Sequence, residues 1–373
     1  MRLSDLPTPC LVLDRQVLQR NLARMAHAVE AGGVALRPHM KTAKSMDVLK
    51  LAMAAGPGSG PRGITVSTLA EAEYFSGHGA MDMIYAVGIT PQKLDQVAKL
   101  NAAGADIKVI TDDLAMAARI AAHPNPPRTL IEIDCGEHRG GLQAEDTLLL
   151  DIAAKLGPAL IGVLTHAGHS YAGRSDAAIQ EIAEAERATA VHAAERLRAS
   201  GHEITIVSIG SSPTALHGRS FEGITEIRPG VYMFGDLFQA EIGTHGRNDI
   251  AVSALTSVVG TRPKEGKILV DAGSIALSKD RSTGDTANDL GFGLVVDMQG
   301  QASLGRSIVV KAYQEHGVVA LDPTMPGYQP PIGTKLRVLP NHVCLMAAAH
   351  DRYFVVDGNS EDVVAIWPRV GGW

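Results

Sequence analysis

The sequence has few cysteines, no long apolar run and no concentration of charge of one sign. Its three cysteines, Cys10, Cys135 and Cys344, are scattered and odd in number, which argues against a disulfide framework and fits a reducing compartment. No apolar run reaches the ~18 residues of a membrane span, and the segment Met1 to Asp5 does not open a signal peptide. We therefore expect a cytoplasmic protein that does not bind membranes.

The charge balance excludes nucleic acid and anionic lipid as partners. The formal net charge is -6 and is spread over both halves of the chain, so no basic surface is predicted. We expect the partners to be small molecules. The 373 residues exceed a typical single domain, and a barrel plus a smaller domain accounts for the length.

The first 235 residues alternate β-branched apolar bursts with stretches of helical spacing, which is typical of repeated β-α units. Helices are predicted between the bursts, among them Arg15 to Ala31, Leu69 to Gly77, Leu94 to Ala103 and Ala177 to Ser200. Eight bursts predict a (β/α)8 barrel with its active site at the C-terminal ends of the strands. The predicted strands are Val34 to Leu36, Ile64 to Ser67, Met83 to Val87, Ile107 to Thr111, Leu130 to Asp134, Leu160 to Thr165, Ile204 to Ile209 and Ile227 to Phe234.

After about residue 240 the pattern changes to short β-like segments separated by Gly, Pro and Asp turns, which predicts an all-β domain. We place the barrel at residues 12–240 and the β domain at 241–373 together with 1–11. The strand-like segment Pro7 to Asp14 precedes the first helix, so it is expected to pair with the β domain. The predicted β segments are Ala251 to Gly260, Lys267 to Asp271, Gly293 to Asp297, Ser307 to Val310, Leu336 to Leu339 and Tyr353 to Asp357.

Polar residues cluster where the predicted barrel strands end, and two of these segments have the composition of a phosphate site. Gly210 to Thr214 follows the seventh strand and Pro229 to Tyr232 lies in the eighth, the positions where barrels often hold phosphate with backbone N–H groups and hydroxyls. The alternative is that Gly and Ser only make turns here.

Lys41 lies just after the first predicted strand and is a candidate Schiff-base lysine. A lysine at a strand end, a phosphate cup across the mouth, and Arg139 and Arg228 together fit pyridoxal phosphate. An arginine beside the pyridine nitrogen would keep that nitrogen unprotonated. Taken alone, a lysine in this position is more often an ordinary solvated lysine, and Lys44 could either lower the pKa of Lys41 or be a surface charge.

His342 and Cys344 form the second candidate constellation, within Leu339 to Met346. In an extended strand, positions i and i+2 point to one side with Cα atoms roughly 6.5–7 Å apart, so both side chains could reach one ion. Nitrogen plus sulfur favours zinc, and two protein ligands leave positions open for substrate and water. The alternative is a satisfied histidine and a buried apolar cysteine. Asp280-Arg281 and Gln314 to Gly317 either line the cleft or fill turns.

Taken together, these motifs resemble the D-serine dehydratase and D-threonine aldolase family of fold-type III pyridoxal phosphate enzymes. The resemblance covers nearly the full length and implies an alanine-racemase-like barrel with a β domain, usually a homodimer. Its marks are Arg37-Pro38-His39-Met40-Lys41-Thr42, Thr165-His166-Ala167-Gly168, Gly210 to Thr214, Arg228-Pro229-Gly230-Val231-Tyr232, Val270 to Gly273, Ser278 to Arg281, Gln314 to Gly317, Pro340 to Cys344 and Gly372-Trp373.

The resemblance also implies roles for individual residues. Lys41 corresponds to the lysine that binds the cofactor covalently, and His342 with Cys344 to a pair that binds Zn2+ or another divalent metal such as Mn2+ or Co2+. The remaining positions expected around the cofactor are Arg139, His166, Tyr171, Thr214, Gly230 and Val231.

Two reactions occur in this family. A dehydratase removes the β-hydroxyl of a D-β-hydroxy amino acid such as D-serine, D-threonine or D-threo-3-hydroxyaspartate and gives a 2-oxo acid and ammonia. An aldolase breaks the Cα–Cβ bond and gives glycine and an aldehyde. Cys344 followed by Leu345 to Ala349 resembles the dehydratases, whereas several aldolases have Asp in place of the cysteine, so we expect a dehydratase.

Three other readings stay open at this point. Related barrels bind pyridoxal phosphate without evident turnover, although they lack a second β domain. A zinc hydrolase would use His342, Cys344 and barrel histidines, but ligands in such enzymes normally lie on barrel strands. A racemase would need a second base, and only Tyr313 and Tyr353 are available in the β domain, neither in a convincing motif.

Overall fold

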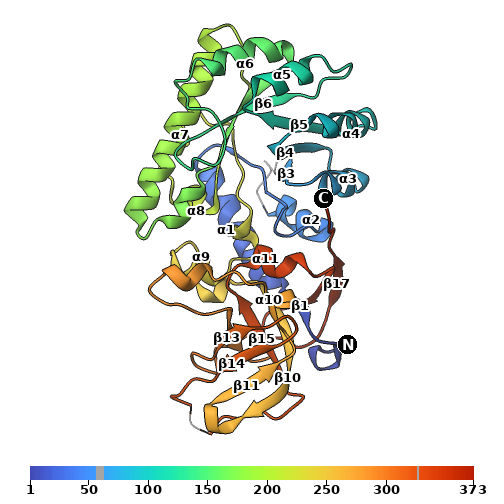
Figure 1. Ribbon diagram of the computed structural model, residues 1–373, viewed down its shortest axis with the longest axis vertical. Helices are drawn as coiled ribbons and strands as arrows, with labels where there is room; N and C mark the ends of the chain where they lie inside the picture. Colours follow the sequence, from blue (N-terminus) through green and yellow to red (C-terminus); the bar gives the residue numbers. More distant parts are fainter. Residues whose placement is uncertain (56–62, 326) are drawn as a thin grey trace. The chain divides into compact units, whose positions relative to one another are not determined.

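The computed structural model describes residues 1–55, 63–325 and 327–373 (Figure 1). The chain forms two compact units. One contains residues 1–22 and 231–371, and the other contains 23–230 and 372–373. We call them the β unit and the barrel unit. Within the described ranges, no helix has both the length and the apolar composition needed to cross a bilayer.

The barrel unit contains one parallel sheet of eight strands in the order β2-β9-β8-β7-β6-β5-β4-β3. The ends of this sheet meet, because the N–H of Met40 donates to the carbonyl of Thr65 at 2.8 Å and that of Thr65 to the carbonyl of Pro38 at 2.9 Å. The predicted (β/α)8 barrel is therefore confirmed. Its strands are β2 (Ala35–Leu36), β3 (Ile64–Val66), β4 (Asp82–Gly88), β5 (Asp106–Thr111), β6 (Thr129–Ile133), β7 (Leu160–Thr165), β8 (Ile206–Ile209) and β9 (Glu226–Ile227).

Helices surround these strands as an outer layer (Figure 1), and their bounds follow the sequence pattern closely. In α1, Leu18, Leu22, Met25 and Val29 recur at helical spacing and are buried, so one face of the helix packs inward. One prediction was wrong: the eighth strand ends at Ile227, and residues 231–233 form a 3-10 turn. The helices are α1 (Arg15–Ala31), α2 (Met46–Ala54), α3 (Leu69–Gly77), α4 (Pro91–Ala102), α5 (Leu114–Ala121), α6 (Leu148–Leu156), α7 (Asp176–Ala199) and α8 (Ser212–His217).

Buried charges hold the short strands β2 and β9 in the ring. Each strand has two residues, and the two pair over only those residues. The side chain of Arg37, directly after β2, is buried; its Nε lies 2.7 Å from Glu226 Oε2 and its Nη1 lies 2.9 Å from Asp82 Oδ1. Lys108 Nζ reaches the same Asp82 oxygen at 2.6 Å. Ion pairs thus supplement a short backbone ladder at this place.

Gly162 shows how tightly the barrel strands pack. A Cβ atom at this position would overlap the carbonyl oxygen of Ile206 on β8, which is a backbone atom that cannot turn away. We expect Gly162→Ala to lower the free energy of unfolding by roughly 1–3 kcal/mol because the strands must separate, measured as a lower urea midpoint. Gly77→Ala is the control, since Gly77 has open space around it; equal midpoints for both variants would contradict the expectation.

The β unit contains a nine-stranded sheet in the order β11-β14-β13-β12-β15-β10-β1-β16-β17, with a further pairing of β11 with β10. The strand β1 pairs with β10 and β16, as predicted for Pro7 to Asp14. The strands are β1 (Cys10–Asp14), β10 (Val252–Arg262), β11 (Lys267–Val270), β12 (Gly293–Val296), β13 (Ile308–Ala312), β14 (Gly317–Ala320), β15 (Lys335–Pro340), β16 (Arg352–Val356) and β17 (Ala365–Pro368).

This unit also contains three short helices, α9 (Leu237–Glu241), α10 (Ser274–Leu277) and α11 (Val343–Ala348), which the sequence did not predict.

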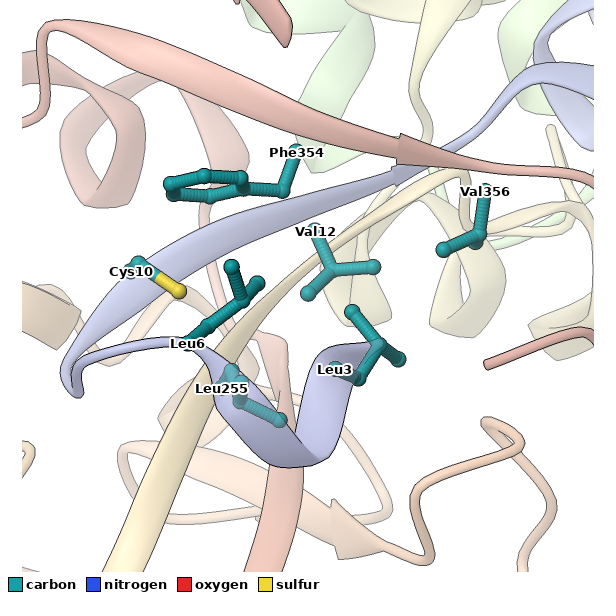
Figure 2. Packing of buried hydrophobic residues seen from close by; sticks show 7 residues of the cluster. All are labelled: Leu3, Leu6, Cys10, Val12, Leu255, Phe354 and Val356. Carbon is teal, nitrogen blue, oxygen red and sulfur yellow. The ribbon is translucent and has the colours of Figure 1, made fainter. Parts of the chain in front are cut away.

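A buried cluster anchors the start of the chain against β10 and β16 (Figure 2). Burying such side chains is the main stabilising contribution to a sheet face. Its members are Leu3, Leu6, Cys10, Val12, Leu255, Phe354 and Val356.

Candidate active site

Lys41 lies at the C-terminal end of β2, in a loop that backbone hydrogen bonds hold on two sides. The N–H of His39 donates to the carbonyl of Pro229 at 2.8 Å, and that of Met40 to Thr65. The Lys41 side chain itself is exposed. A fixed backbone with a free amine is what a covalent attachment point requires.

Lys44 forms a buried ion pair, so the interpretation of it as a surface charge was wrong. Its Nζ lies 3.0 Å from Oε1 of Glu71, whose side chain is fully buried. Glu71 also accepts hydrogen bonds from the N–H and the hydroxyl of Ser67. Lys44 is therefore not a solvated surface charge, and its ion pair ties the Lys41 loop to the end of β3.

His166 follows β7 and is held in one tautomer. Its Nδ1 lies 2.9 Å from the carbonyl oxygen of Gly210. Burial, followed by the positive charges of Lys41, Arg228 and Arg139, lowers the pKa of His166 to about 3. The ring is thus neutral at physiological pH, and because a carbonyl only accepts, Nδ1 carries the proton and Nε2 is an acceptor.

His39 has a similar environment. Burial lowers its pKa well below the ordinary value, and the charges of Lys41 and Arg228 lower it further. Two neutral imidazoles therefore accompany a group of cationic side chains at the mouth of the barrel. Such a concentration of positive charge favours an anionic ligand.

Arg228 is one of these cations and is fully enclosed by the barrel. Its Nη1 donates to Ser208 Oγ at 2.7 Å and its Nη2 to the carbonyl of Thr165 at 2.6 Å. Ser208 in turn donates to Glu226 Oε1 at 2.6 Å. Burial lowers the pKa of Arg228 to about 10, so the guanidinium remains charged at pH 7 and its position is fixed.

Arg139 is exposed, in a loop that Asp134 organises. Oδ1 of Asp134 accepts the N–H groups of Gly136 at 2.9 Å and His138 at 3.1 Å, and Oδ2 accepts Gln143 Nε2 at 3.0 Å. Asp134 is therefore a structural residue of this loop. The Arg139 charge acts on His166, which places the guanidinium near the mouth.

The predicted phosphate segment begins with a glycine that no other residue could replace. Gly210 has φ +126°, and a Cβ there would lie 2.7 Å from Ile227 Cγ2 and 2.8 Å from the N–H nitrogen of Arg228. The next residue, Ser211, caps α8, and its hydroxyl accepts the N–H of Thr214 at 3.2 Å while Thr214 Oγ1 accepts the N–H of Ser211 at 3.0 Å. These internal bonds fix the loop but use several of its donors.

Gly230 supplies an N–H group that no acceptor among the described residues takes. A Cβ at this position would lie 3.0 Å from the carbonyl oxygen of His39, so a side chain here would require His39 to shift. In the described part of the barrel unit, the N–H of Gly230 donates to no acceptor. A buried N–H without an acceptor is costly unless a ligand completes it. With the cationic mouth, this makes the barrel unit a suitable site for the phosphate group of pyridoxal phosphate.

The other predicted cofactor positions divide between the two units. Tyr171 lies in the 3-10 turn Gly168–Ala172 after β7 and is half-buried. Val231 belongs to the β unit. The barrel unit thus contains Lys41, Arg139, His166, Tyr171, Thr214 and Gly230, and the β unit contains Val231, His342 and Cys344.

The proposed metal pair does not lie in an extended strand, so that expectation was wrong. β15 ends at Pro340, His342 is the N-cap of α11 with φ -137°, and Cys344 is in the first turn of the helix. The two side chains nevertheless meet, because the His342 ring hydrogen-bonds Cys344. A helix start brings them together as effectively as the predicted strand would.

The carboxylate of Asp280 orients the His342 ring through its Nδ1 atom. Asp280 Oδ2 lies 2.7 Å from Nδ1 of His342, and Ser282 Oγ holds the other oxygen of Asp280 at 2.5 Å. Burial lowers the pKa of His342, but the hydrogen bonds to Asp280 and Cys344 outweigh it and raise the pKa to about 11. A histidine with a carboxylate on its far nitrogen is the usual arrangement of a metal ligand.

The donor set fits a metal with open coordination positions. One imidazole and one thiol suit zinc and similar ions. Among the described residues, no group of three or more His, Cys, Asp or Glu side chains is arranged to hold a metal. An ion bound by His342 and Cys344 would thus leave positions for substrate or solvent.

We expect Asp280→Asn to weaken metal binding by roughly 10–100-fold, because the His342 ring loses its charged orienting partner. The measurement is a competition titration of the purified protein with a chelator. Asp289→Asn is the control, since Asp289 is in the same loop but pairs with Arg281. Equal affinities in the two variants would show that Asp280 does not act on the metal ligand.

The sequence pointed to Asp280-Arg281 without giving either residue a role. Asp280 contacts the His342 ring, whereas Arg281 forms an ion pair with Asp289. Gln314 to His316 are exposed in the turn between β13 and β14. Two buried carboxylates, Glu226 and Glu186, were missed. Glu186 had a signal, because it is the one charged residue on the inward face of α7.

Comparison with known proteins gives matches over the whole chain. Residues 13–237 match the family model "Alanine racemase, N-terminal domain", and residues 251–356 match "Putative serine dehydratase domain". D-threo-3-hydroxyaspartate dehydratase of Delftia sp. (strain HT23) is 43% identical, covering 100% of this chain and 99% of that protein.

Two further relatives represent both reactions considered above. D-serine dehydratase of Dictyostelium discoideum is 30% identical and covers 98% of each chain. 3-Hydroxy-D-aspartate aldolase of Paracoccus denitrificans (strain Pd 1222) is also 30% identical, covering 98% of this chain and 92% of that protein.

Among solved structures, a cysteine-to-alanine mutant of D-threo-3-hydroxyaspartate dehydratase in the metal-free form has a TM-score of 0.95 and 42% identity. It covers 100% of both chains.

Proposed function

Because the chain belongs to the D-serine dehydratase and D-threonine aldolase family, we propose that it is a pyridoxal phosphate-dependent and divalent-metal-dependent lyase. Its reaction is removal of the β-hydroxyl of a D-β-hydroxy amino acid, with a 2-oxo acid and ammonia as products. The observation that carries the proposal is the 43% identity to a D-threo-3-hydroxyaspartate dehydratase over the full chain, together with Lys41 at the mouth of the barrel.

Pyridoxal phosphate, when bound, supplies an electron-accepting ring that makes the α-proton of an amino acid acidic. We assign to Lys41 the covalent attachment and the transfer of that proton at Nζ. The neutral His166 supplies an acceptor at Nε2, and Gly230 and Thr214 hold the phosphate. Arg139, Tyr171 and Val231 complete the proposed cofactor residues.

A divalent metal, when bound, supplies a Lewis acid that makes a hydroxyl a better leaving group. We propose His342 and Cys344 as its protein ligands and zinc as the ion, with Asp280 holding the imidazole in place. Departure of the hydroxyl as water also needs a proton, which Lys41 Nζ carries after it takes the α-proton.

The experiment that tests this proposal is product analysis with purified protein, pyridoxal phosphate and zinc. D-threo-3-hydroxyaspartate, D-serine and D-threonine are supplied in turn, and 2-oxo acid, ammonia, glycine and aldehyde are measured. We expect equal amounts of 2-oxo acid and ammonia. Cofactor binding with no product from any of the three would contradict the lyase proposal and favour a cofactor-binding protein.

Retro-aldol cleavage is the second candidate, favoured by the 30% identity to a 3-hydroxy-D-aspartate aldolase. Glycine and an aldehyde in the same assay would establish it. Cys344 supports dehydration instead, because the dehydratases are the branch that this cysteine motif resembles. The homodimer is a prediction from the family, checked by light scattering.

A further inference from the structure

Asn341 is a buried side chain immediately before His342, the first of the two proposed metal ligands. β15 ends at Pro340 and α11 begins at Val343, so Asn341 lies in the turn between the strand and the helix. Its side chain is almost completely buried. A buried amide needs hydrogen-bond partners, because it loses its contacts with water.

The amide of Asn341 makes three hydrogen bonds to one loop of the β unit. Oδ1 accepts the N–H of Thr283 at 2.9 Å, while Nδ2 donates to Thr283 Oγ1 at 2.8 Å and to the carbonyl of Gly291 at 2.7 Å. A backbone N–H only donates and a carbonyl only accepts, so these partners determine the orientation of the amide. Both N–H bonds of the amide are thus used to hold this loop.

Thr283 connects the amide to the part of the loop that contains Asp280. It lies in the 3-10 turn Ser282–Asp285, which begins two residues after Asp280, and its side chain is fully buried. Its hydroxyl accepts the N–H of Leu290 at 3.0 Å in addition to the Asn341 amide. One buried threonine thus joins Asn341 to both the start and the end of the loop.

The contact that this loop makes with the metal ligand is less protected than the amide. Asp280 Oδ2 lies 2.7 Å from His342 Nδ1, and both side chains are partly exposed. A partly exposed ion pair holds two side chains together only weakly, whereas breaking a buried hydrogen bond leaves an unsatisfied polar group. The buried amide of Asn341 is therefore the stronger of the two constraints on the loop.

We propose that Asn341 is a positioning residue of the metal site, because its amide keeps the Asp280 carboxylate on Nδ1 of His342. It does so by holding the loop of Asp280 at Thr283 and Gly291. With Nδ1 occupied by a carboxylate, Nε2 is the nitrogen left to bind a metal. The inference rests on the metal site proposed above and adds the residue that holds its orienting carboxylate in place.

The contact between Asp280 and His342 can be followed in the metal-free protein by proton NMR, with the histidines labelled with ¹⁵N. A ring proton hydrogen-bonded to a carboxylate is expected to give a low-field signal, which Asp280→Ala should remove. Asn341→Ala is expected to remove or broaden the same signal. Absence of the signal from the unmodified protein, or an unchanged signal in Asn341→Ala, would overturn the proposal.

Asn21→Ala is the matched control for the loss of a buried amide. Asn21 is also a buried asparagine of the β unit, but its amide donates to the carbonyls of Met233 and Asp249. This variant is expected to lose stability without changing the low-field signal or the affinity for zinc. A loss of the signal as large as that in Asn341→Ala would show that general destabilisation is the cause, which would overturn the proposal.

The effect on the metal is measured by competition titration of zinc against a chelator, with single and double variants. Asn341→Ala and Asp280→Ala are each expected to weaken zinc binding by roughly tenfold or more. The double variant should bind zinc within about threefold of Asp280→Ala, because no carboxylate then remains to be held. Losses that multiply in the double variant would mean that the two residues act independently and would contradict the proposal.

Thr283 offers a second pair of variants if Asn341→Ala does not fold, as judged by its melting temperature. Thr283→Ser keeps the hydroxyl that accepts the Asn341 amide, whereas Thr283→Val removes it. Zinc binding and the low-field signal should be retained in the first and weakened in the second. Equal values in the two variants would overturn the proposal.

Failure of the proposed function gives a different result from failure of this inference. An unmodified protein that binds no zinc would overturn the metal site. The low-field signal of the metal-free protein would still report whether Asn341 holds Asp280 on the His342 ring, because that measurement needs neither metal nor turnover.

Discussion

Replacing Lys41 by alanine is expected to remove the visible absorbance of the lysine-bound cofactor and to lower turnover by at least about a hundredfold. In the proposed function this amine both attaches the cofactor and moves the substrate proton, and loss of a positioned acid or base alone typically costs 10²–10⁴-fold. The measurements are the absorbance spectrum and the initial rate of 2-oxo acid formation with saturating cofactor.

Lys50→Ala is the matched control for this variant. Lys50 is an exposed lysine of α2 that lies 3.9 Å from Asp47, and its loss should change neither the spectrum nor the rate. Retention of the visible band in Lys41→Ala would show that another lysine holds the cofactor, because the band requires a covalent link to an amine.

Removing the proposed metal ligands is the second change with a large expected effect. His342→Ala and Cys344→Ala should each release the bound metal and lower turnover by roughly 10²–10⁴-fold, while the visible absorbance remains. The reason is that a hydroxyl is a poor leaving group unless a Lewis acid or a proton assists it. Metal content by elemental analysis and rate are measured on the same samples.

Chelation gives an independent check on the same site. A chelator should stop turnover of the unmodified protein, and added zinc should restore it, but neither treatment should change the two variants. Cys10→Ala is the control, since Cys10 is a buried cysteine of β1 with its pKa raised to about 12 by burial. Full activity in metal-free protein would contradict a metal-assisted elimination.

The barrel could be predicted from the sequence because its strands are buried on both faces and therefore appear as continuous apolar bursts. The eighth strand was the exception. Pro229 and Gly230 interrupt the apolar run after Ile227, and the chain turns there because Gly230 must approach His39 closely. A local pattern does not contain that contact, since it joins residues almost two hundred positions apart.

Candidate site residues could be proposed from the sequence where one residue carries a chemical signature, whereas the contacts that support them come from distant residues. Lys41, His342 and Cys344 could be named from motifs. The ion pair of Lys44 with Glu71 and the hydrogen bonds from Ala167 and Gly210 to Glu186 depend on tertiary contacts. The strand assumed for His342 failed because an apolar β-like run continues into the first turn of α11.

The ion pairs of Arg37 imply that the barrel has a preferred place to open. The backbone ladder is short on both sides of β2, because β2 pairs with β9 over two residues and the ring closes towards β3 by a single bridge between His39 and Thr65. The charges of Arg37, Glu226 and Asp82 complete the ring there. Local unfolding begins where the fewest hydrogen bonds must break, so amide exchange should be fastest around β2. Lys41, the proposed attachment point of the cofactor, follows this strand. If the cofactor is bound there, its release is expected to precede unfolding of the whole barrel and to report local opening around β2.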